Sequence, residues 1–288
     1  MRETIKNYFK LVKFSHTVFA MPFALLGFFM AVELYNYDFT SRIFIFIILC
    51  MVFARNAGMG FNRYADRFID AKNPRTSNRE IPANKIKSRN ALIFVIVNSI
   101  LFIITTYFIN VLCFILSLPA LVIILLYSYT KRFTYLSHIF IGLALSIAPA
   151  AAFIAVTGKL FFPVIILSLL VLFWTAGFDI IYSLQDEVFD RNEKLHSLPA
   201  RFGRKTAIGI ARIFHIISFI LSLIFNYLIG INPLNIIGTI IFGIMLFYQN
   251  KIVKIHDISK VNLAFGTVNG IASVVYTIII IISFYTSF

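Results

Sequence analysis

The chain has 288 residues, of which 60% are hydrophobic and only 13% charged, and its mean hydropathy is +0.89. This composition excludes a soluble globular protein and predicts a multi-pass membrane protein. The net charge is +14, and basic charge in so apolar a chain favours an anionic membrane surface over nucleic acid as the partner. Cys50 and Cys113 lie in apolar runs without a CxxC pairing, so neither a disulfide framework nor a zinc site is expected.

The first residues have an amphipathic pattern. Ile5 and Phe9 share one helical face, and Lys6 and Lys10 lie on the other. The pattern predicts either an interfacial helix on the membrane surface or a first span that begins early. No small-residue cleavage site stands out in the apolar run that follows, so a signal peptide is not expected.

Nine segments of near-membrane length predict an all-α, polytopic membrane protein. These segments are Phe14–Val32, Ile43–Phe61, Ala91–Ile109, Val111–Tyr129, Leu136–Val156, Phe161–Leu184, Ala207–Leu228, Leu234–Tyr248 and Leu263–Phe284. Only Asn110 separates the third segment from the fourth, which predicts a tight hairpin at that position.

The distribution of lysine and arginine is an independent check on nine spans. Nine spans place 22 of the 26 basic residues on one side of the membrane and only Arg42 and Lys159 on the other, while Arg55 and Arg212 fall inside spans. We therefore expect a plasma (inner) membrane protein whose amino terminus and two long polar loops are cytoplasmic.

Eight of the 12 acidic residues fall in two segments, 66–80 and 179–193. Asn62, Asp66 and Asp70 are spaced four residues apart, so on a helix they stack along one face. Asp186 and Asp190 follow Asp66 and Asp70 at an offset of 120 residues. The repetition predicts a weak internal duplication within a single domain, residues 1–288.

Amide and carboxylate oxygens next to arginines suit a diphosphate held by Mg²⁺. Solvated ion pairs at a helix end are the alternative, but two copies at one offset favour ligation. Arg55 and Asp179 lie seven residues, or about 10 Å, further inward. A charge there costs about 2.5–3.5 kcal/mol, so we expect a functional role or a mutual ion pair. The neighbouring Gly58 and Gly60 predict either room for a ligand or close helix packing.

These residues resemble the motifs of the UbiA superfamily of intramembrane prenyltransferases. The first motif of that family, N-x-x-x-D-x-x-x-D, is matched by Asn62, Asp66 and Asp70. The second, D-x-x-Y-x-x-x-D-x-x-x-D, is matched by Asp179, Tyr182, Asp186 and Asp190. The segment YSYTKRF, residues 127–133, resembles the Y-x-x-x-K/R element of the family. The resemblance implies nine transmembrane helices around a central cavity that opens sideways to lipid.

Within the superfamily the chain is most similar to the 4-hydroxybenzoate polyprenyltransferases. Arg63 stands where the proteobacterial form usually has aspartate, and the surrounding run also resembles the MqnP-like prenyltransferase of the futalosine route to menaquinone. The resemblance implies transfer of a polyprenyl group from polyprenyl diphosphate to an aromatic acid in quinone biosynthesis. The acceptor is of the 4-hydroxybenzoate type or is a dihydroxynaphthoate.

The resemblance also implies roles for individual residues. Mg²⁺ is expected on Asn62, Asp66, Asp70, Asp186 and Asp190. Substrate contacts are expected from Arg67, Tyr127, Lys131, Arg132 and Tyr182. The acceptor carboxylate is expected to pair with Arg55 or Arg132, and its hydroxyl to face Asp179 or Asp186.

A transporter or channel for an anionic solute is the alternative from another class of protein. It predicts charged residues on both halves of the membrane, whereas here nearly all of them lie on one face, which favours an enzyme. The loop Pro74–Asn84 is either a lid that becomes ordered over diphosphate or an ordinary solvated loop. The five histidines are scattered without ligand spacing, so a histidine metal site is not expected.

Overall fold

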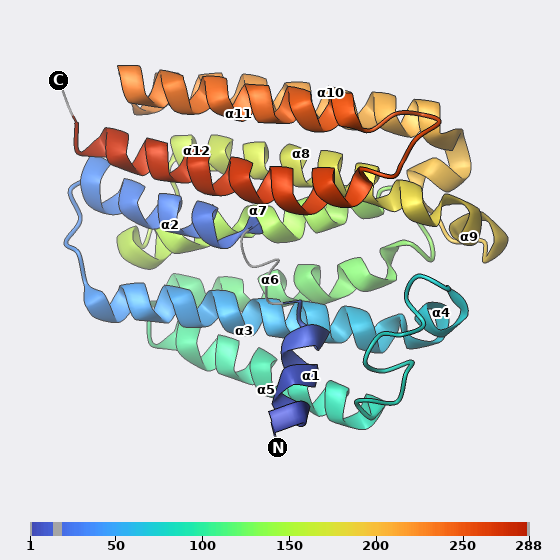
Figure 1. The fold of residues 1–288 in the computed structure, drawn as a ribbon. Coiled ribbons are helices and arrows are strands. Elements are labelled where there is room, and N and C mark those ends of the chain that lie inside the picture. The colour runs from blue at the N-terminus through green and yellow to red at the C-terminus, as the bar shows by residue number, and fades with distance from the viewer. Residues whose placement is uncertain (1, 14–18, 287–288) are drawn as a thin grey trace. The chain divides into compact units, whose positions relative to one another are not determined.

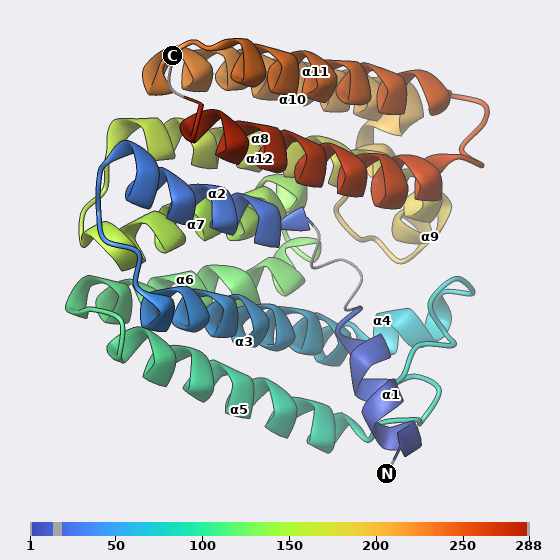
Figure 2. The same ribbon diagram turned by 60° about the vertical axis from the view of Figure 1, so that its left-hand side comes forward.

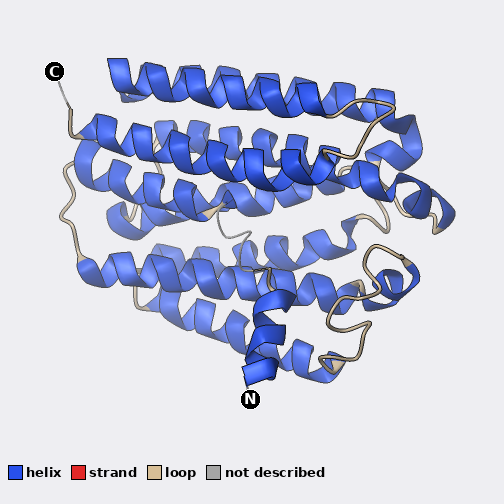
Figure 3. Ribbon diagram, viewed as in Figure 1, coloured by secondary structure: helices blue, strands red, loops and turns tan. Residues whose placement is uncertain are grey.

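A computed structural model describes residues 2–13 and 19–286, and every regular element in them is helical (Figures 1 and 3). The chain divides into two compact units. Unit 1 comprises Met1–Thr17 and Ile45–Tyr129, and unit 2 comprises Val18–Phe44 and Thr130–Phe288. The single domain expected from the sequence stays a prediction.

Eight helical segments in the described residues are long and apolar enough to cross a membrane. Each coincides with one of the predicted spans, so the all-α, multi-pass prediction is confirmed. The remaining prediction, Phe14–Val32, corresponds to a shorter apolar helix, Met21–Leu34. Residues 14–18 of that prediction lie outside the described part of the chain.

Unit 1 contains most of five helices, which are α1 (Arg2–Leu11), α3 (Ser41–Ala65), α4 (Arg67–Lys72), α5 (Ser88–Tyr107) and α6 (Val111–Thr130). The tight hairpin at Asn110 is confirmed, because α5 ends at Tyr107 and α6 begins at Val111. The Asn110 side-chain oxygen accepts a hydrogen bond from the Cys113 backbone N–H at 2.7 Å. That bond satisfies one of the free N–H groups at the start of α6.

Close helix packing explains the two glycines of α3. A Cβ atom on Gly58 would lie 2.8 Å from the Ile124 side chain of α6. A Cβ atom on Gly60 would lie 3.0 Å from the Val95 side chain of α5. Of the two sequence-based predictions for these glycines, the structure supports the close approach of helix backbones.

The amphipathic helix α1 is separate from the spans. It ends at Leu11, and Lys13 has a positive φ of 43°. Leu11 packs against Ile81 and Ile86, while Ile5 and Phe9 remain exposed. A helix that keeps apolar side chains uncovered beside lysines is typical of a membrane interface, so the structure supports the interfacial prediction.

Unit 2 contains α2 (Met21–Phe29), η2 (Met30–Leu34), α7 (Ser137–Thr157), α8 (Phe162–Ser183), η3 (Leu184–Asp186), α9 (Glu187–Asn192), α10 (Leu198–Ile229), α11 (Pro233–Ile252), η4 (Leu263–Val268) and α12 (Asn269–Phe284). Contacts run from α2 to α7, α8, α10, α11, α12 and back to α2 (Figure 2). Six helices therefore form a closed ring of neighbours. Its buried centre is aromatic and includes Trp174, Phe178, Phe242 and Tyr276.

Candidate functional site

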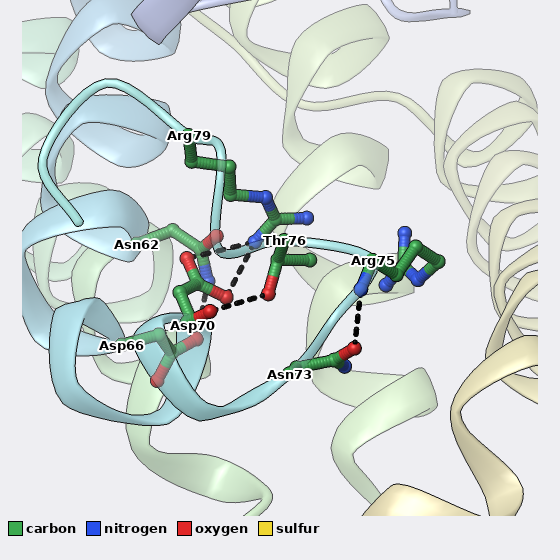
Figure 4. Close-up of polar contacts among 7 residues, drawn as sticks. All are labelled: Asn62, Asp66, Asp70, Asn73, Arg75, Thr76 and Arg79. Carbon is green, nitrogen blue, oxygen red and sulfur yellow. Dashed lines mark hydrogen bonds and ion pairs between the residues drawn. The ribbon is translucent and has the colours of Figure 1, made fainter. Parts of the chain in front are cut away.

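The first acidic motif lies at the end of α3. Asp66 (φ −91°, ψ 6°) interrupts the helix that carries the motif and separates α3 from the six-residue α4. The backbone N–H of Asp66 still bonds to the Asn62 carbonyl at 3.0 Å, and that of Asp70 to the Asp66 carbonyl at 2.7 Å. These bonds keep the four-residue spacing, so the three side chains lie together (Figure 4).

Side-chain contacts tie this motif to the loop that follows it (Figure 4). The Asn62 amide donates to Asp66 Oδ2 at 3.2 Å. Arg79 Nη1 donates to both carboxylate oxygens of Asp70, at 2.7 and 2.8 Å. Asp70 is only 5% exposed, and this ion pair offsets the cost of burying its charge.

The loop Pro74–Asn84 is folded against unit 1. Thr76 and Ile81 are buried, and the Thr76 hydroxyl donates to the Asp70 carbonyl at 3.0 Å. Ile81 belongs to an apolar cluster with Leu11 and Ile86. The prediction of an ordinary solvated loop therefore does not describe this segment, and a lid function stays a prediction.

Positive charge is concentrated beside the first motif. Arg63 is 4% exposed, and its Nε atom has no hydrogen-bond partner in the described residues. The pKa of Lys13 is lowered to about 8, chiefly by burial and also by the nearby Arg63, Arg79 and Arg75, while Glu80 acts in the opposite direction. Partly buried cations that repel one another form a place where a multivalent anion binds favourably.

Arg67, the first residue of α4, is held by the last turn of α3 and by its neighbour Phe68. Its Nη1 atom donates to the Tyr64 carbonyl at 2.7 Å. Its guanidinium also lies over two aromatic rings, 4.4 Å from the centroid of Tyr64 and 4.3 Å from that of Phe68. These cation–π contacts orient the predicted substrate-binding arginine.

Arg55 anchors the segment that follows α1. Its Nη2 atom donates to the carbonyl of Lys13 at 2.9 Å and to that of Val12 at 3.4 Å. Tyr127 lies close enough to Arg55 to interact with it electrostatically. Backbone carbonyls and a phenol therefore surround this intramembrane arginine in unit 1.

The second acidic motif repeats the local structure of the first. Asp186 (φ −102°, ψ 3°), the last residue of η3, precedes the six-residue α9, just as Asp66 precedes α4. Asp190 and Asp70 are each the fourth residue of their short helix, and both are buried. The backbone thus follows the same course at the predicted offset of 120 residues.

Asp190 has an open acceptor oxygen. Its side chain is 3% exposed, and Ser197 donates a hydrogen bond to it. Its Oδ2 atom is buried without a hydrogen-bond partner in the described residues. Lys131, Asp186 and His138 lie close enough to interact with it electrostatically. An uncommitted carboxylate oxygen is a suitable ligand for a hard divalent cation.

Asp179 has a partner that the sequence did not suggest. His138 Nδ1 lies 2.7 Å from Asp179 Oδ2. The two side chains are 1% and 18% exposed. They are 41 residues apart on different helices, so no spacing rule identifies the pair. Arg55 and Asp179 therefore each have polar contacts within their own unit. The predicted ion pair between them is not required to stabilise either charge.

The remaining predicted substrate residues divide between the units. Tyr127 lies in unit 1, whereas Lys131, Arg132 and Tyr182 lie in unit 2. The Tyr182 ring stacks on Phe265, with centroids 4.1 Å apart. The Lys131 carbonyl accepts a hydrogen bond from the His196 backbone N–H at 2.6 Å.

No group of three or more His, Cys, Asp or Glu side chains in the described residues is arranged to hold a metal ion by itself. Mg²⁺, however, is usually bound through one or two carboxylates together with substrate phosphates. The oxygen donors of both motifs, including the open Oδ2 of Asp190, fit a cation of that kind.

Comparison with known proteins confirms the family resemblance. Residues 20–279 match the UbiA prenyltransferase family. Two similar proteins are named 4-hydroxybenzoate octaprenyltransferase: one from Aliivibrio fischeri, 33% identical over 177 residues, and one from Nitrosomonas eutropha, 33% identical over 168 residues. These matches cover 60% and 58% of this chain, and the chain spans about three fifths of the length of these curated relatives, 61% and 59%.

Solved structures show the same fold. The apo structure of a UbiA homolog from Aeropyrum pernix K1 is 27% identical, with a TM-score of 0.83 over 93% of this chain and 98% of the other. A UbiA homolog from Archaeoglobus fulgidus bound to GPP and Mg²⁺ is 22% identical, with a TM-score of 0.71 over 95% and 99%. On the extent of the family match and the agreement in fold, the chain belongs to the UbiA prenyltransferase family.

Proposed function

We propose that this protein transfers a polyprenyl group from polyprenyl diphosphate to an aromatic carboxylic acid and releases diphosphate. The observation that carries the proposal is the repeated helix end, in which a break at an aspartate is followed by a buried aspartate four residues later. The names of the relatives support an acceptor of the 4-hydroxybenzoate type, with a dihydroxynaphthoate as the alternative. The product would enter quinone biosynthesis.

Divalent cations would be held by the oxygens of Asn62, Asp66, Asp70, Asp186 and Asp190. The structures of a homolog bound to GPP and Mg²⁺ and to DMAPP and Mg²⁺ support a divalent cation in the reaction. When bound, Mg²⁺ supplies positive charge that stabilises the diphosphate leaving group.

The basic side chains of the protein would bind the diphosphate directly. Lys13, Arg63 and Arg79 gather beside the first motif, and Lys131 lies near Asp190. Arg67 and Arg132 add positive charge. Together they favour breakage of the allylic C–O bond, in which both bonding electrons leave with the diphosphate. Apolar and aromatic surroundings keep water away from the allylic cation that remains.

The acceptor would be oriented at its two ends. Arg55 or Arg132 pairs with its carboxylate, and Asp179 or Asp186 takes the hydroxyl proton. The ring carbon ortho to that oxygen then bonds to the allylic carbon. The ring carbon then loses its own proton, aromaticity returns, and the phenolate oxygen regains the proton held by the aspartate. The net products are the prenylated acid, diphosphate and one proton.

A membrane assay tests the reaction. Asp66→Ala and Asp186→Ala should each lower turnover by at least about 10²-fold, because each removes stabilisation of the leaving group. Asp257→Ala changes an exposed loop carboxylate and should leave turnover unchanged. The measurements are diphosphate release and the mass of the lipid product formed from mixed hydroxybenzoate and dihydroxynaphthoate.

Two outcomes would contradict the proposal. Normal turnover in Asp66→Ala or Asp186→Ala would refute the metal assignment. Passage of an anion across the membrane of vesicles without diphosphate release would favour a transporter.

The expected placement in the plasma membrane, with the motif loops cytoplasmic, is tested by labelling single cysteines in those loops on intact and opened cells.

A further inference from the structure

His138 lies in α7 of unit 2 and is almost fully buried. Its Nδ1 atom is 2.7 Å from Asp179 Oδ2 on the neighbouring helix α8. The contact is possible because the two helices approach at Gly142, one turn after His138. A Cβ atom on Gly142 would lie 2.5 Å from the Leu172 carbonyl oxygen. A glycine therefore sets the helix separation that brings His138 to Asp179.

The polar contacts of His138 differ from those of a purely structural histidine. His215, also buried in unit 2, has both ring nitrogens within hydrogen-bonding distance of Gln249 or Asn250. His138 contacts Asp179 through one nitrogen, and its buried Nε2 has no hydrogen-bond partner in the described residues. Buried polar atoms are normally paired. Because one ring nitrogen of His138 lacks a partner, the contact with Asp179 is the polar interaction that indicates a role for this histidine.

We propose that His138 is a positioning residue that holds Asp179 as the base for the acceptor hydroxyl; this inference rests on the proposed prenyl transfer. With Asp179 ionised, His138 Nδ1–H donates to Oδ2, which orients the carboxylate and stabilises its charge. The Asp179 side chain is 18% exposed, and its Oδ1 atom is left for the substrate.

This proposal names Asp179, rather than Asp186, as the base. Asp179 is oriented by a histidine from the neighbouring helix, whereas Asp186 directly precedes α9. In the proposed step the acceptor O–H bond breaks, the proton moves to Asp179 Oδ1, and the electron pair on oxygen activates the ortho carbon. His138 keeps its proton on Nδ1 and does not touch the acceptor.

Three substitutions at one position test this role. His138→Asn retains an N–H near the Nδ1 position, so kcat should stay within about threefold of wild type. His138→Leu and His138→Gln place no donor there, and each should lower kcat by at least about tenfold, within the contribution of a general base. KM for the polyprenyl diphosphate should not change. Kinetics in detergent with saturating Mg²⁺ supply these values.

A double mutant separates positioning from packing. If His138 acts only through Asp179, then His138→Leu combined with Asp179→Asn should be no slower than Asp179→Asn alone. His215→Leu is the matched control, because it removes a buried histidine of the same unit that makes no contact with the motif acids. It should lower thermal stability without a selective loss of kcat.

The possible results distinguish failure of the proposed function from failure of this inference. Inactive wild-type protein would overturn the proposed function and this inference with it. If the wild type is active, full kcat in His138→Gln, equal losses in His138→Asn and His138→Gln, or additive losses in the double mutant would overturn the inference alone. The comparison of Asn with Gln remains decisive if the Leu variant does not fold.

Discussion

Asp70 and Asp190 occupy equivalent positions in the two motifs, but their carboxylate oxygens have different hydrogen-bond partners. The Arg79 guanidinium pairs with both oxygens of Asp70. Asp190 instead accepts from Ser197 through one oxygen, and its other oxygen has no hydrogen-bond partner in the described residues. The two copies of the motif are therefore chemically unequal, and the open oxygen of unit 2 is ready to accept a cation without first losing an arginine.

Lys13 makes the stability of the protein depend on pH in an unusual direction. Its pKa falls from 10.5 to about 8 in the folded state, chiefly because of burial. Between these values the unfolded chain binds a proton that the folded chain does not, so stability rises with pH across this window. The cost of the charged lysine is fully present below pH 8.

Lys13→Met should remove this dependence. Thermal unfolding in detergent should find the variant more stable than wild type at pH 7, with the difference shrinking as pH rises from about 8 to 10.5. Lys6→Met, on the exposed face of α1, is the control and should show no such change. A constant difference across the window would contradict the assignment.

At the scale of the element, the spacing of the two motifs predicted which side chains share a face but not where the helices end. Residues four apart stack along one face of a helix, yet α4 begins after Asp66 and α9 begins after Asp186. Neither aspartate caps the short helix that follows it with its side chain. The periodicity therefore predicted the shared orientation of the side chains, but no capping signal in the sequence marked the break.

The contact between α7 and α8 depends on Gly142. Gly142→Ala should cost about 1–3 kcal/mol of unfolding free energy, because the new methyl group would meet the Leu172 carbonyl, which cannot rotate away. It should also lower kcat by separating His138 from Asp179. Gly209→Ala in α10 is the matched control, since nothing lies within 4 Å of its Cβ position.

The control variant Gly209→Ala should not lower the free energy of unfolding. Alanine is favoured over glycine in a helix interior by about 0.5–1 kcal/mol, so Gly209→Ala should be neutral or slightly stabilising. Both variants are measured by denaturant titration in mixed micelles. Equal effects at the two positions would mean that the α7–α8 approach is not tight.

At the scale of the whole molecule, the motifs belong to different compact units. Asn62, Asp66 and Asp70 lie in unit 1, and Asp179, Asp186 and Asp190 lie in unit 2. Each unit supplies acidic oxygens and basic side chains of its own. Neither unit has three or more His, Cys, Asp or Glu side chains arranged to hold a metal ion among its described residues. In the proposed reaction, substrate phosphates would complete the coordination.

Removal of divalent cations should therefore abolish both turnover and donor binding. Geranyl diphosphate at about a hundred times its Kd should stabilise the protein by about 2.7 kcal/mol when Mg²⁺ is present. The shift in melting temperature should disappear with EDTA and return with excess Mg²⁺. Asp190→Asn should reduce the Mg²⁺-dependent part of the shift. An equal shift in the presence of EDTA would contradict Mg²⁺-dependent binding of the donor.

The sequence by itself determined the fold class, the order of the spans and the hairpin at Asn110, because apolar runs must satisfy their backbone within a membrane. It also determined the two acidic motifs, since they are local in the chain. Only the tertiary structure decided the partners of buried charges: His138 for Asp179, Arg79 for Asp70, and backbone carbonyls for Arg55. These contacts depend on which helices pack together and how closely, and a contact over 41 residues leaves no periodic trace in the sequence.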